Sequence, residues 1–470
     1  MAAAIPPQVA LQLRQATGLI QQGRLDAAEA LLGAIVQQFP ACADAHYLYG
    51  VAASLGHDEE RALAALQRAL ALDKKNAGYH LQAGISLIAL GRPAEAVPRY
   101  RDAARLNPNL PEAHYNLGVA LQATGDRDGA IAAYRAALLR RGDFVEALNN
   151  LSNLLLARGQ AAEALQLLQR AIAVRPNFHI PYNNYGNALV RQKRHGEAIA
   201  AFRKALDIEP AFAEARTNLA EQLHIIGNDA ESAAQYEQLL ALQPENVNAR
   251  FALAALRSEN PPTAPESFVR KVFEDLAQSF DEHLVDTLEY GIPGLLIAEL
   301  RPWLDSQAPV AVLDLGCGTG LFGIEVKPWS RRLDGIDLAP SMVERSRERG
   351  IYDSVSVAEL TAYLATLADR SLDLVTATDV FIYCGDLAKI FAEAQRVIRA
   401  GGRFAFSVEA SDADDYVLRS SCRYAHSRAY LERLAREHAF GIVSVLETPI
   451  RKERGEPIPG YLLILEAGPS

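Results

Sequence analysis

Residues 310–320 read VAVLDLGCGTG, and this stretch decides the fold of the second half of the chain. An apolar run ends in Asp314 and breaks into alternating glycines, and a second apolar run then leads to Asp337. The order predicts a strand, a tight turn, a helix and a second strand that ends in a carboxylate. The spacing is G-x-G-x-G, whereas a dinucleotide site has G-x-G-x-x-G and aims a helix N-terminus at a pyrophosphate. A cofactor without phosphates needs only close backbone approach and an anchor for an amine, and Asp314 fits that anchor.

Further along the chain, short apolar runs alternate with helical patterns. After the first strand, the runs RLDGIDL, SVSVAE, SLDLVTATDVF and GRFAFSVEA predict four more, and GIVSVLETPIR and GYLLILEA predict a closing antiparallel pair. This predicts an α/β domain with a seven-stranded sheet over residues 267–468. Residues 267–303, ahead of the sheet, predict two or three amphipathic helices. Three prolines in SENPPTAP interrupt the helical period, so residues 259–266 are the expected linker.

The glycine loop together with Asp337 resembles the first two motifs of class I S-adenosylmethionine-dependent methyltransferases. The alternative is a glycine-rich turn in another α/β domain, including an NAD-binding one. The resemblance covers the predicted α/β domain and implies a Rossmann-like sheet that binds S-adenosylmethionine as methyl donor.

The same resemblance assigns roles in the donor site. Asp314 would hold the amino group of the methionine part, directly or through water, and Asp337 would accept hydrogen bonds from both ribose hydroxyls. Glu359 stands where an aspartate usually meets the adenine amino group, and Asp379 would face the cleft between donor and acceptor. A helix cap or an exposed turn is the alternative role for each carboxylate. The expected donor-binding set is Asp314, Gly316, Cys317, Gly318, Gly320, Asp337, Leu338, Met342, Glu359, Leu360 and Asp379.

The sequence says less about the methyl acceptor than about the methyl donor. The fourth strand continues as DVFIYCGDL, which lacks the Asn/Asp-Pro-Pro-Tyr/Phe motif of enzymes that act on amide or adenine nitrogen, and the double-glutamate loop of arginine methyltransferases is missing. RYAHSRAYLERL, residues 423–434, predicts a loop over the site, with His426 as candidate base and Tyr383 and Tyr424 as acceptor-positioning groups. A surface or capping histidine is the alternative. Residues 267–303 resemble a methyltransferase lid in which Phe280 replaces a tyrosine.

Small residues recur every 34 residues in the first half of the chain. They are Gly50, Gly84, Gly118, Ser152, Gly186, Ala220 and Ala254. Turn positions recur in register at Pro40, Lys74, Pro108, Gly142, Pro176, Pro210 and Pro244. This period, with small residues where helices cross, is the tetratricopeptide pattern. It predicts an array of about seven repeats plus a cap helix over residues 9–258.

Asparagines recur at one position of the first helix of four successive repeats: Asn116, Asn150, Asn184 and Asn218. An amide side chain offers an acceptor and two donors, so it pairs with an extended backbone of any sequence. The series resembles the asparagine ladder in the repeat groove of O-linked N-acetylglucosamine transferases, which implies a protein or peptide partner in the groove. Solvated asparagines are the alternative.

Composition and charge limit the remaining possibilities. The chain has 470 residues, of which 50% are hydrophobic and 22% charged, as in ordinary globular proteins. Residues 1–258 have a net charge of +1 and residues 259–470 one of −11, which disfavours nucleic acid as substrate. The four cysteines are far apart, so no metal site is expected. No stretch has membrane-spanning length or the pattern of a signal peptide, and a cytoplasmic protein is expected.

The whole chain resembles bacterial proteins described as methyltransferases with tetratricopeptide repeats. The resemblance rests on LDLGCGTG, YDSVSVAEL, GGRFAFSVE, RYAHS and GEPIPGYL. It implies a two-domain enzyme, with an all-α repeat solenoid followed by the α/β domain, whose repeats recruit a protein or peptide as substrate or scaffold. Two alternatives stay open: a small-molecule methyltransferase whose repeats serve assembly, and a non-enzymatic adaptor with a degenerate methyltransferase domain.

Overall fold

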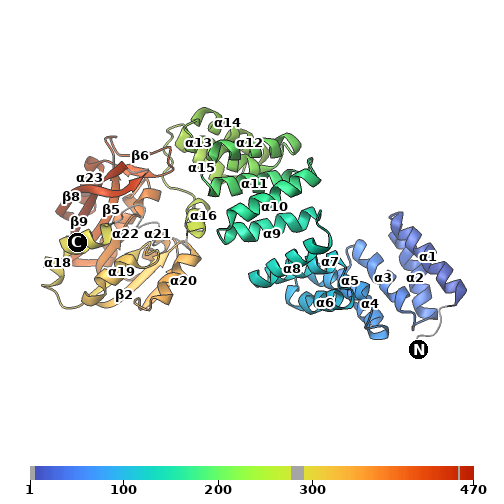
Figure 1. The fold of residues 1–470 in the computed structure, drawn as a ribbon. Coiled ribbons are helices and arrows are strands. Elements are labelled where there is room, and N and C mark those ends of the chain that lie inside the picture. Colours follow the sequence, from blue (N-terminus) through green and yellow to red (C-terminus); the bar gives the residue numbers. More distant parts are fainter. Residues whose placement is uncertain (1–5, 277–290, 454–455, 470) are drawn as a thin grey trace. The chain divides into compact units, whose positions relative to one another are not determined.

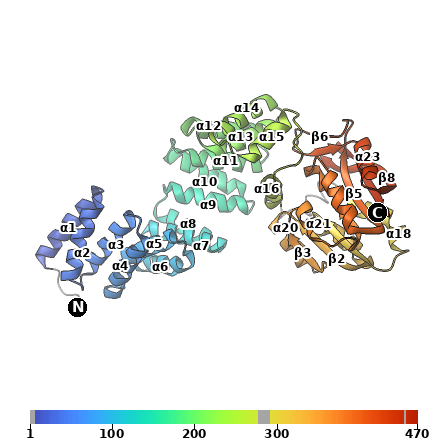
Figure 2. The same cartoon turned by 180° about the vertical axis from the view of Figure 1, so that it is seen from behind.

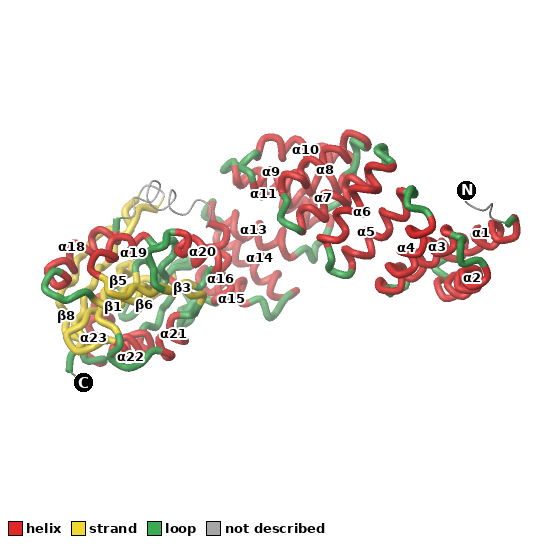
Figure 3. The backbone as a smooth tube through the Cα atoms, turned by 90° about the horizontal axis from the view of Figure 1, so that it is seen from below, coloured by secondary structure: helices red, strands yellow, loops and turns green. Residues whose placement is uncertain are grey.

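The computed structural model describes residues 6–276, 291–453 and 456–469 (Figure 1). The chain divides into two compact units, Met1–Ile226 and Gly227–Ser470, and each is described by itself. The first unit is all-helical and the second contains a mixed sheet with helices, as the sequence predicted; Figure 3 shows the strands, in yellow, only in the second unit. Within the described ranges, no helix is both long and apolar enough to cross a membrane.

Helices of the first unit follow one another in antiparallel pairs (Figure 2). They are α1 (Pro7–Gln21), α2 (Leu25–Gln38), α3 (Ala43–Leu55), α4 (Glu59–Leu72), α5 (Ala77–Ala89), α6 (Pro93–Leu106), α7 (Pro111–Ala123), α8 (Arg127–Arg140), α9 (Val145–Ala157), α10 (Ala161–Val174), α11 (His179–Arg191), α12 (His195–Ile208) and α13 (Ala213–Ile225). Each helix packs against the next along the chain. Odd-numbered helices also contact one another, so they share one face of the array.

The recurring small residues lie where the two helices of a pair touch. A Cβ atom on Gly84 would lie 2.4 Å from the ring of Tyr100, and one on Gly186 would lie 2.4 Å from the ring of Phe202. No real side chain tolerates such distances, so the aromatic ring occupies the space that the glycine leaves. The period seen in the sequence is therefore a packing requirement of the helix pairs.

A second periodic contact closes the turns between repeats. Nε2 of His46, His80 and His114 lies 3.0 Å from the carbonyl oxygen of the residue six positions earlier. Nη2 of Arg216 donates to Pro210 O at 2.5 Å in the same register. These carbonyls belong to the turn positions that recur in the sequence, and each side chain supplies one of them with a hydrogen-bond partner after its helix ends.

In the second unit a nine-stranded sheet is surrounded by helices. The strands are β1 (Val310–Leu315), β2 (Ser330–Asp337), β3 (Ser354–Val357), β4 (Leu372–Ala377), β5 (Ile398–Ala410), β6 (Tyr416–Leu418), β7 (Tyr424–His426), β8 (Phe440–Glu453) and β9 (Glu456–Ala467). The helices are α14 (Asp229–Leu242), α15 (Val247–Leu256), α16 (Glu266–Leu276), α18 (Ile292–Leu304), α19 (Leu321–Val326), α20 (Pro340–Glu348), α21 (Leu360–Thr366), α22 (Ala388–Val397) and α23 (Arg428–Glu437), with short 3-10 turns at Lys327–Trp329 and Phe381–Tyr383.

Strand order in this sheet is β3-β2-β1-β4-β5-β7-β6, and β9 joins β5 to β8. The pairs among β1 to β5 are parallel, and β8 and β9 form the antiparallel pair predicted at the end of the chain. Strands β6 and β7 are additional to the seven predicted ones. Glu409 of β5 pairs with Gly460 of β9 on one side and with Ala425 of β7 on the other, so β7 continues the β4 side of β5 beyond the end of β4.

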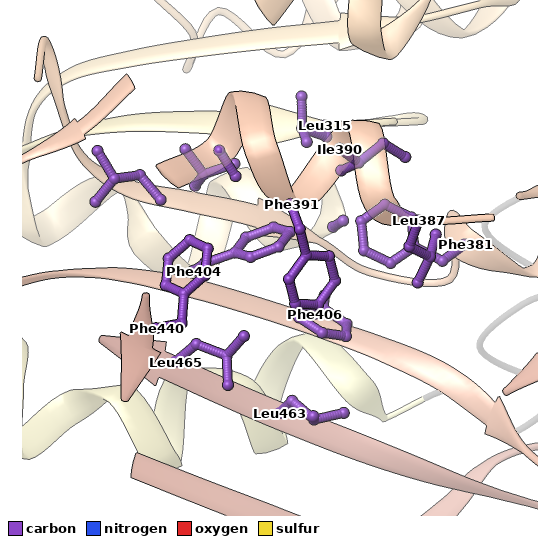
Figure 4. Packing of buried hydrophobic residues seen from close by; sticks show 14 of the residues in the cluster. Leu315, Phe381, Leu387, Ile390, Phe391, Phe404, Phe406, Phe440, Leu463 and Leu465 are labelled. Carbon is purple, nitrogen blue, oxygen red and sulfur yellow. The ribbon is translucent and has the colours of Figure 1, made fainter. Parts of the chain in front are cut away.

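Aromatic rings fill the core between β5, β9 and α22 (Figure 4). The ring of Phe404 lies 4.8 Å from that of Phe406 and 5.4 Å from that of Phe391, measured between centroids. All three side chains are fully buried, and each removes a large apolar area from water. This core fixes β4 beside β5, and the carboxyl end of β4 is part of the candidate site.

The expected linker is bound to the second unit over most of its length. Tyr424 Oη donates to Pro261 O at 2.8 Å, and the N–H groups of Gly385 and Asp386 donate to Pro262 O at 3.0 and 2.8 Å. Ala264 N–H donates to Tyr383 O at 3.0 Å. Prolines have no N–H to donate, but their carbonyl oxygens accept hydrogen bonds here and attach the linker to the second unit.

We expect Gly186→Ala to destabilise the first unit by about 1–3 kcal/mol, because the added methyl group overlaps the ring of Phe202. Gly196→Ala is the matched control, since nothing lies within 4 Å of its Cβ position and alanine favours the helix. Thermal unfolding followed by circular dichroism compares the two variants. Equal melting temperatures would show that close packing is not the reason for the small residue.

Candidate functional site

A pocket opens at the carboxyl ends of the parallel strands β1, β2, β3 and β4. The residues that follow these strands line it together with one face of α16 and part of the terminal hairpin. From the predicted set, the lining contains Gly316, Cys317, Gly318, Asp337, Leu338, Glu359, Leu360, Asp379 and Tyr383. It does not contain Asp314, Gly320, Met342, Tyr424 or His426.

The glycine loop adopts a backbone that other residues rarely take. Gly316, Gly318 and Gly320 have φ angles of 64°, 54° and 93°, in the left-handed region that glycine enters without a steric penalty. A Cβ atom on Gly316 would also lie 2.4 Å from Cγ2 of Val380. The loop therefore passes close to the end of β4, and a bound ligand reaches backbone rather than side chains there.

Asp337 is held by two backbone N–H groups at the end of β2. Gly318 N–H donates to its Oδ2 at 3.0 Å, and Ala339 N–H donates to its Oδ1 at 2.9 Å. The residue is only 8% exposed, and burial raises the pKa of its carboxyl while the backbone donors oppose that rise. The carboxylate is thus fixed in orientation beside the glycine loop.

Asp314 lies behind the pocket wall. It is 1% exposed, Tyr352 Oη donates to its Oδ2 at 2.7 Å, and Thr376 Oγ1 donates to its Oδ1 at 3.2 Å. Burial raises the pKa of this carboxyl to about 7, against the effect of the two hydroxyls. In this geometry Asp314 ties β1 to β4 and to Tyr352 and is not among the residues that line the pocket. Its expected hold on an amino group, directly or through water, stays a prediction.

The remaining predicted donor residues differ in their surroundings. Glu359 is the N-cap of α21, where its Oε2 accepts from Ala362 N–H at 2.7 Å and from Thr361 Oγ1 at 2.6 Å. Burial raises the pKa of Glu359, but these hydrogen bonds outweigh burial and the net shift is downward, so the side chain is ionised. Met342 is fully buried beside Ala339 and does not reach the pocket.

The opposite end of the pocket contains charged residues that sequence reasoning missed. Arg451 of β8 is 3% exposed and lines the pocket, and its Nη1 donates to Asp379 Oδ1 at 2.6 Å. Arg451 also pairs with the buried Glu409, which Arg419 contacts at 2.7 Å. The sequence signal for Arg451 was only its place in the predicted antiparallel pair at the end of the chain.

Tyr383 and Arg423 lie at this same end. The Arg423 guanidinium hydrogen bonds to the Tyr383 hydroxyl, and burial nevertheless raises the pKa of Tyr383. The backbone of Asp379 has φ of 58°, a left-handed value that a non-glycine residue rarely adopts, and its N–H donates to Ser407 Oγ at 2.9 Å. Asp379 at the end of β4 thus combines an unfavourable backbone conformation with a charged side chain in the pocket wall.

His426 and Tyr424 belong to β7 and face away from the pocket lining. His426 is fully buried, its Nε2 lies 2.9 Å from Cys384 O and 3.1 Å from Gly385 O, and burial lowers its pKa to about 4. The segment was expected to be a loop over the site, but pairing with β5 makes it a strand. A histidine enclosed in this way is neutral and supports the backbone after β4, so its position does not suit a base that meets the acceptor.

Helix α16 forms the apolar wall of the pocket. Val269, Val272 and Phe273 line it, and the ring of Phe273 lies 5.6 Å from that of Tyr383 in an edge-on arrangement. This helix begins the segment predicted as a lid. Phe280, which replaces a tyrosine of the lid motif, lies outside the described residues.

The asparagine ladder of the first unit is largely engaged in bonds between neighbouring repeats. Three of the four amides donate to a residue 35 positions earlier: Asn150 to Tyr115 Oη at 3.3 Å, Asn184 to Asn149 Oδ1 at 2.7 Å and Asn218 to Asn183 Oδ1 at 2.9 Å. Asn184 is buried, whereas Asn116, Asn150 and Asn218 are partly exposed. These bonds tie adjacent odd-numbered helices together, so the amides have only part of their hydrogen-bonding capacity left for a peptide.

Asp314→Asn should reduce the pH dependence of stability in the second unit. The folded-state pKa is raised to about 7, so the stability that Asp314 contributes is fully present below its unfolded pKa and is lost as the pH rises through about 7. Between pH 5 and 8 the wild-type free energy of unfolding should fall by about 3 kcal/mol more than that of the variant. Calorimetry across this pH range measures the free energy of unfolding of both proteins. If the two free energies changed with pH in parallel, the raised pKa of Asp314 would be contradicted.

Comparisons with known proteins match both units. A family model described as a methyltransferase domain matches residues 313–406, and one described as a tetratricopeptide repeat matches residues 13–77, 81–146, 120–178 and 149–215. The repeat region is also similar to the solved structure of TTC0263, a tetratricopeptide-repeat protein of Thermus thermophilus, at 25% identity and a TM-score of 0.33, over 39% of this chain and 99% of that chain.

Curated relatives match the second unit. The malonyl-[acyl-carrier protein] O-methyltransferase of Serratia marcescens is 33% identical over 100 residues, which are 21% of this chain and 38% of that protein. The demethylmenaquinone methyltransferase of Bacteroides fragilis is 29% identical over 142 residues, which are 28% of this chain and 57% of that protein. The chain therefore spans less than two thirds of the length of either relative.

Proposed function

On the premise that this chain joins tetratricopeptide repeats to a methyltransferase domain, we propose that it is an S-adenosylmethionine-dependent methyltransferase whose repeats recruit a protein or peptide. The observation that carries the proposal is Asp337, a buried carboxylate fixed by Gly318 and Ala339 at the rim of the glycine loop. A carboxylate in this position accepts hydrogen bonds from two vicinal hydroxyls, which are the ribose groups of the donor.

The residues around Asp337 are suited to bind the adenine of the donor and its amino group. Gly316 and Gly318 leave backbone open to the ligand, and Leu338 and Leu360 offer apolar surface for an adenine. Glu359 lies at the same side and is ionised, as an acceptor for an amino group requires. When bound, the donor supplies a sulfonium methyl group, and the protein aligns the acceptor with it.

Repeat units of this kind act through their surfaces, and the odd-numbered helices offer a shared face lined by partly exposed asparagines. We propose an extended segment of a protein or peptide as the partner of that face. The partner serves either as the methyl acceptor or as a scaffold that brings the enzyme to it.

Relatives do not fix the acceptor, because their names give different ones: one acts on malonyl-[acyl-carrier protein] and another on demethylmenaquinone. A small-molecule methyltransferase whose repeats serve assembly is therefore a second candidate. The adaptor alternative is disfavoured because the glycine conformations and the bonds to Asp337 are intact.

Asp337→Ala tests the donor site. We expect full-length protein to bind S-adenosylmethionine and the variant to bind it at least about 100-fold more weakly, since two charge-assisted hydrogen bonds are lost. Calorimetric titration measures both, with Asp369→Ala as the control because that carboxylate is solvent-exposed and pairs with Arg396 away from the pocket. Absence of binding to the unaltered protein would favour the adaptor.

Removal of residues 1–226 separates the two enzyme candidates. The cut follows the division between the compact units and keeps α14, α15 and the bound linker. Donor binding should be unchanged. In assays with radiolabelled donor and cell extract, labelling of a recruited protein should fall to background, whereas turnover of a small molecule should persist. A truncated protein that labels protein acceptors as well as the full chain would contradict recruitment by the repeats.

A further inference from the structure

Tyr352 fills a space behind the glycine loop that three glycines leave open. A Cβ atom on Gly320 would lie 3.0 Å from Cε2 of its ring, one on Gly335 of β2 would lie 2.9 Å from Cε1, and one on Gly323 of α19 would overlap the hydroxyl oxygen. A side chain at any of these positions would press on the ring or displace it. The loop, the helix that follows it and the second strand therefore all pack on one aromatic ring.

The hydroxyl of this tyrosine lies inside the domain and contacts Asp314. It donates to Asp314 Oδ2 at 2.7 Å, while Oδ1 of the same carboxylate accepts from Thr376 Oγ1 of β4 at 3.2 Å. Burial raises the pKa of the hydroxyl, and a hydrogen bond from the backbone of Gly323 opposes that rise without cancelling it. The hydroxyl thus keeps its proton and donates it to the carboxylate, so it links α19 to the end of β1.

Asp314 has no positively charged partner in the described part of the chain. The titratable groups that face it are Tyr352, the Cys317 thiol of the loop and the Asp337 carboxylate at the end of β2. Burial, with a smaller effect of Asp337, raises the pKa of Asp314, whereas the two hydroxyls lower it. Two buried carboxylates beside one loop favour a positively charged ligand at this end of the pocket. The amino group of S-adenosylmethionine is such a group.

The ring and the hydroxyl of Tyr352 contribute in different ways. The ring packs against the three glycines, whereas the hydroxyl stabilises the ionised form of Asp314 by a hydrogen bond. Because the pKa of Asp314 is about 7, its charge changes with pH in the neutral range. Loss of the hydroxyl alone should therefore leave the packing in place and make Asp314 harder to ionise.

Building on the methyltransferase function proposed above, we propose that Tyr352 is a positioning residue of the donor site that acts through Asp314. Its ring supports the glycine loop from behind, and its hydroxyl holds the Asp314 carboxylate in the ionised form that attracts the amino group of the donor, directly or through water. Tyr352 itself is not among the residues that line the pocket.

Tyr352→Phe tests the proposal, because it removes the hydroxyl and leaves the ring. Calorimetric titration with S-adenosylhomocysteine, which has the amino group and the ribose of S-adenosylmethionine, measures the affinity of full-length wild-type and variant protein between pH 6 and 9. Ionisation of the ligand is common to both proteins and cancels in the ratio of their affinities. We expect the variant to bind about tenfold more weakly at pH 6 and within about twofold at pH 9, since loss of the hydrogen bond raises the pKa of Asp314 by about one pH unit.

Tyr430→Phe is the matched control. Tyr430 is also buried, and its hydroxyl also contacts a backbone N–H, that of Leu387 at 2.8 Å, and an aspartate, Asp386 at 3.2 Å. It lies outside the pocket lining. We expect its affinity for S-adenosylhomocysteine to equal that of the wild type at every pH, and circular dichroism shows whether both variants are folded.

A loss of affinity in Tyr352→Phe that is the same at every pH would mean that the hydroxyl acts only on the structure, and it would overturn the proposal, as would equal affinities. Failure of the wild-type protein to bind S-adenosylhomocysteine overturns the donor assignment instead. The effect of the hydroxyl on Asp314 is then measured on the unliganded proteins. The fall in the free energy of unfolding with rising pH should extend about one pH unit higher in the variant. If that fall ends at the same pH in both proteins, the role of Tyr352 is overturned.

Discussion

The hydrogen bond from Gly318 N–H to Asp337 joins the two strand ends on which the whole pocket is built. It exists because the glycine loop takes left-handed backbone angles that turn its N–H groups toward β2. The same loop presses Gly316 against Val380, beside Asp379. Three strand ends are thus set by one short loop, and the residues at both ends of the pocket take their positions from it.

Features that repeat or lie close in sequence could be predicted. The 34-residue period indicated the helix pairs, because a small residue must face a large apolar side chain 16 residues later, as Gly84 faces Tyr100. The order of apolar runs gave β1 to β5, because parallel strands buried on both faces need continuous apolar sequence. Asp337 was found since strand, turn and carboxylate follow one another within a short stretch of chain.

Pairings between distant residues could not be predicted. Asp314 and Tyr352 are 38 residues apart, and Arg451 and Asp379 are 72 apart, so no local pattern joins them. The misplaced role of His426 has the same origin, because its burial depends on strand β7 pairing with β5. The ladder asparagines show the same limit in the repeats. Their period is visible in the sequence, but their hydrogen-bond partners in the neighbouring repeat are not.

The bonds from the linker to the residues after β4 have a mechanical consequence. The covalent chain reaches the methyltransferase domain through Pro261, Pro262 and Ala264, which are fastened to Tyr424, Gly385, Asp386 and Tyr383. Since Tyr424 belongs to β7, a pull on the linker passes through these hydrogen bonds to one strand of the sheet and to the residues after β4. Since Tyr383 also lines the pocket, a pull on the linker is felt at the pocket wall as well.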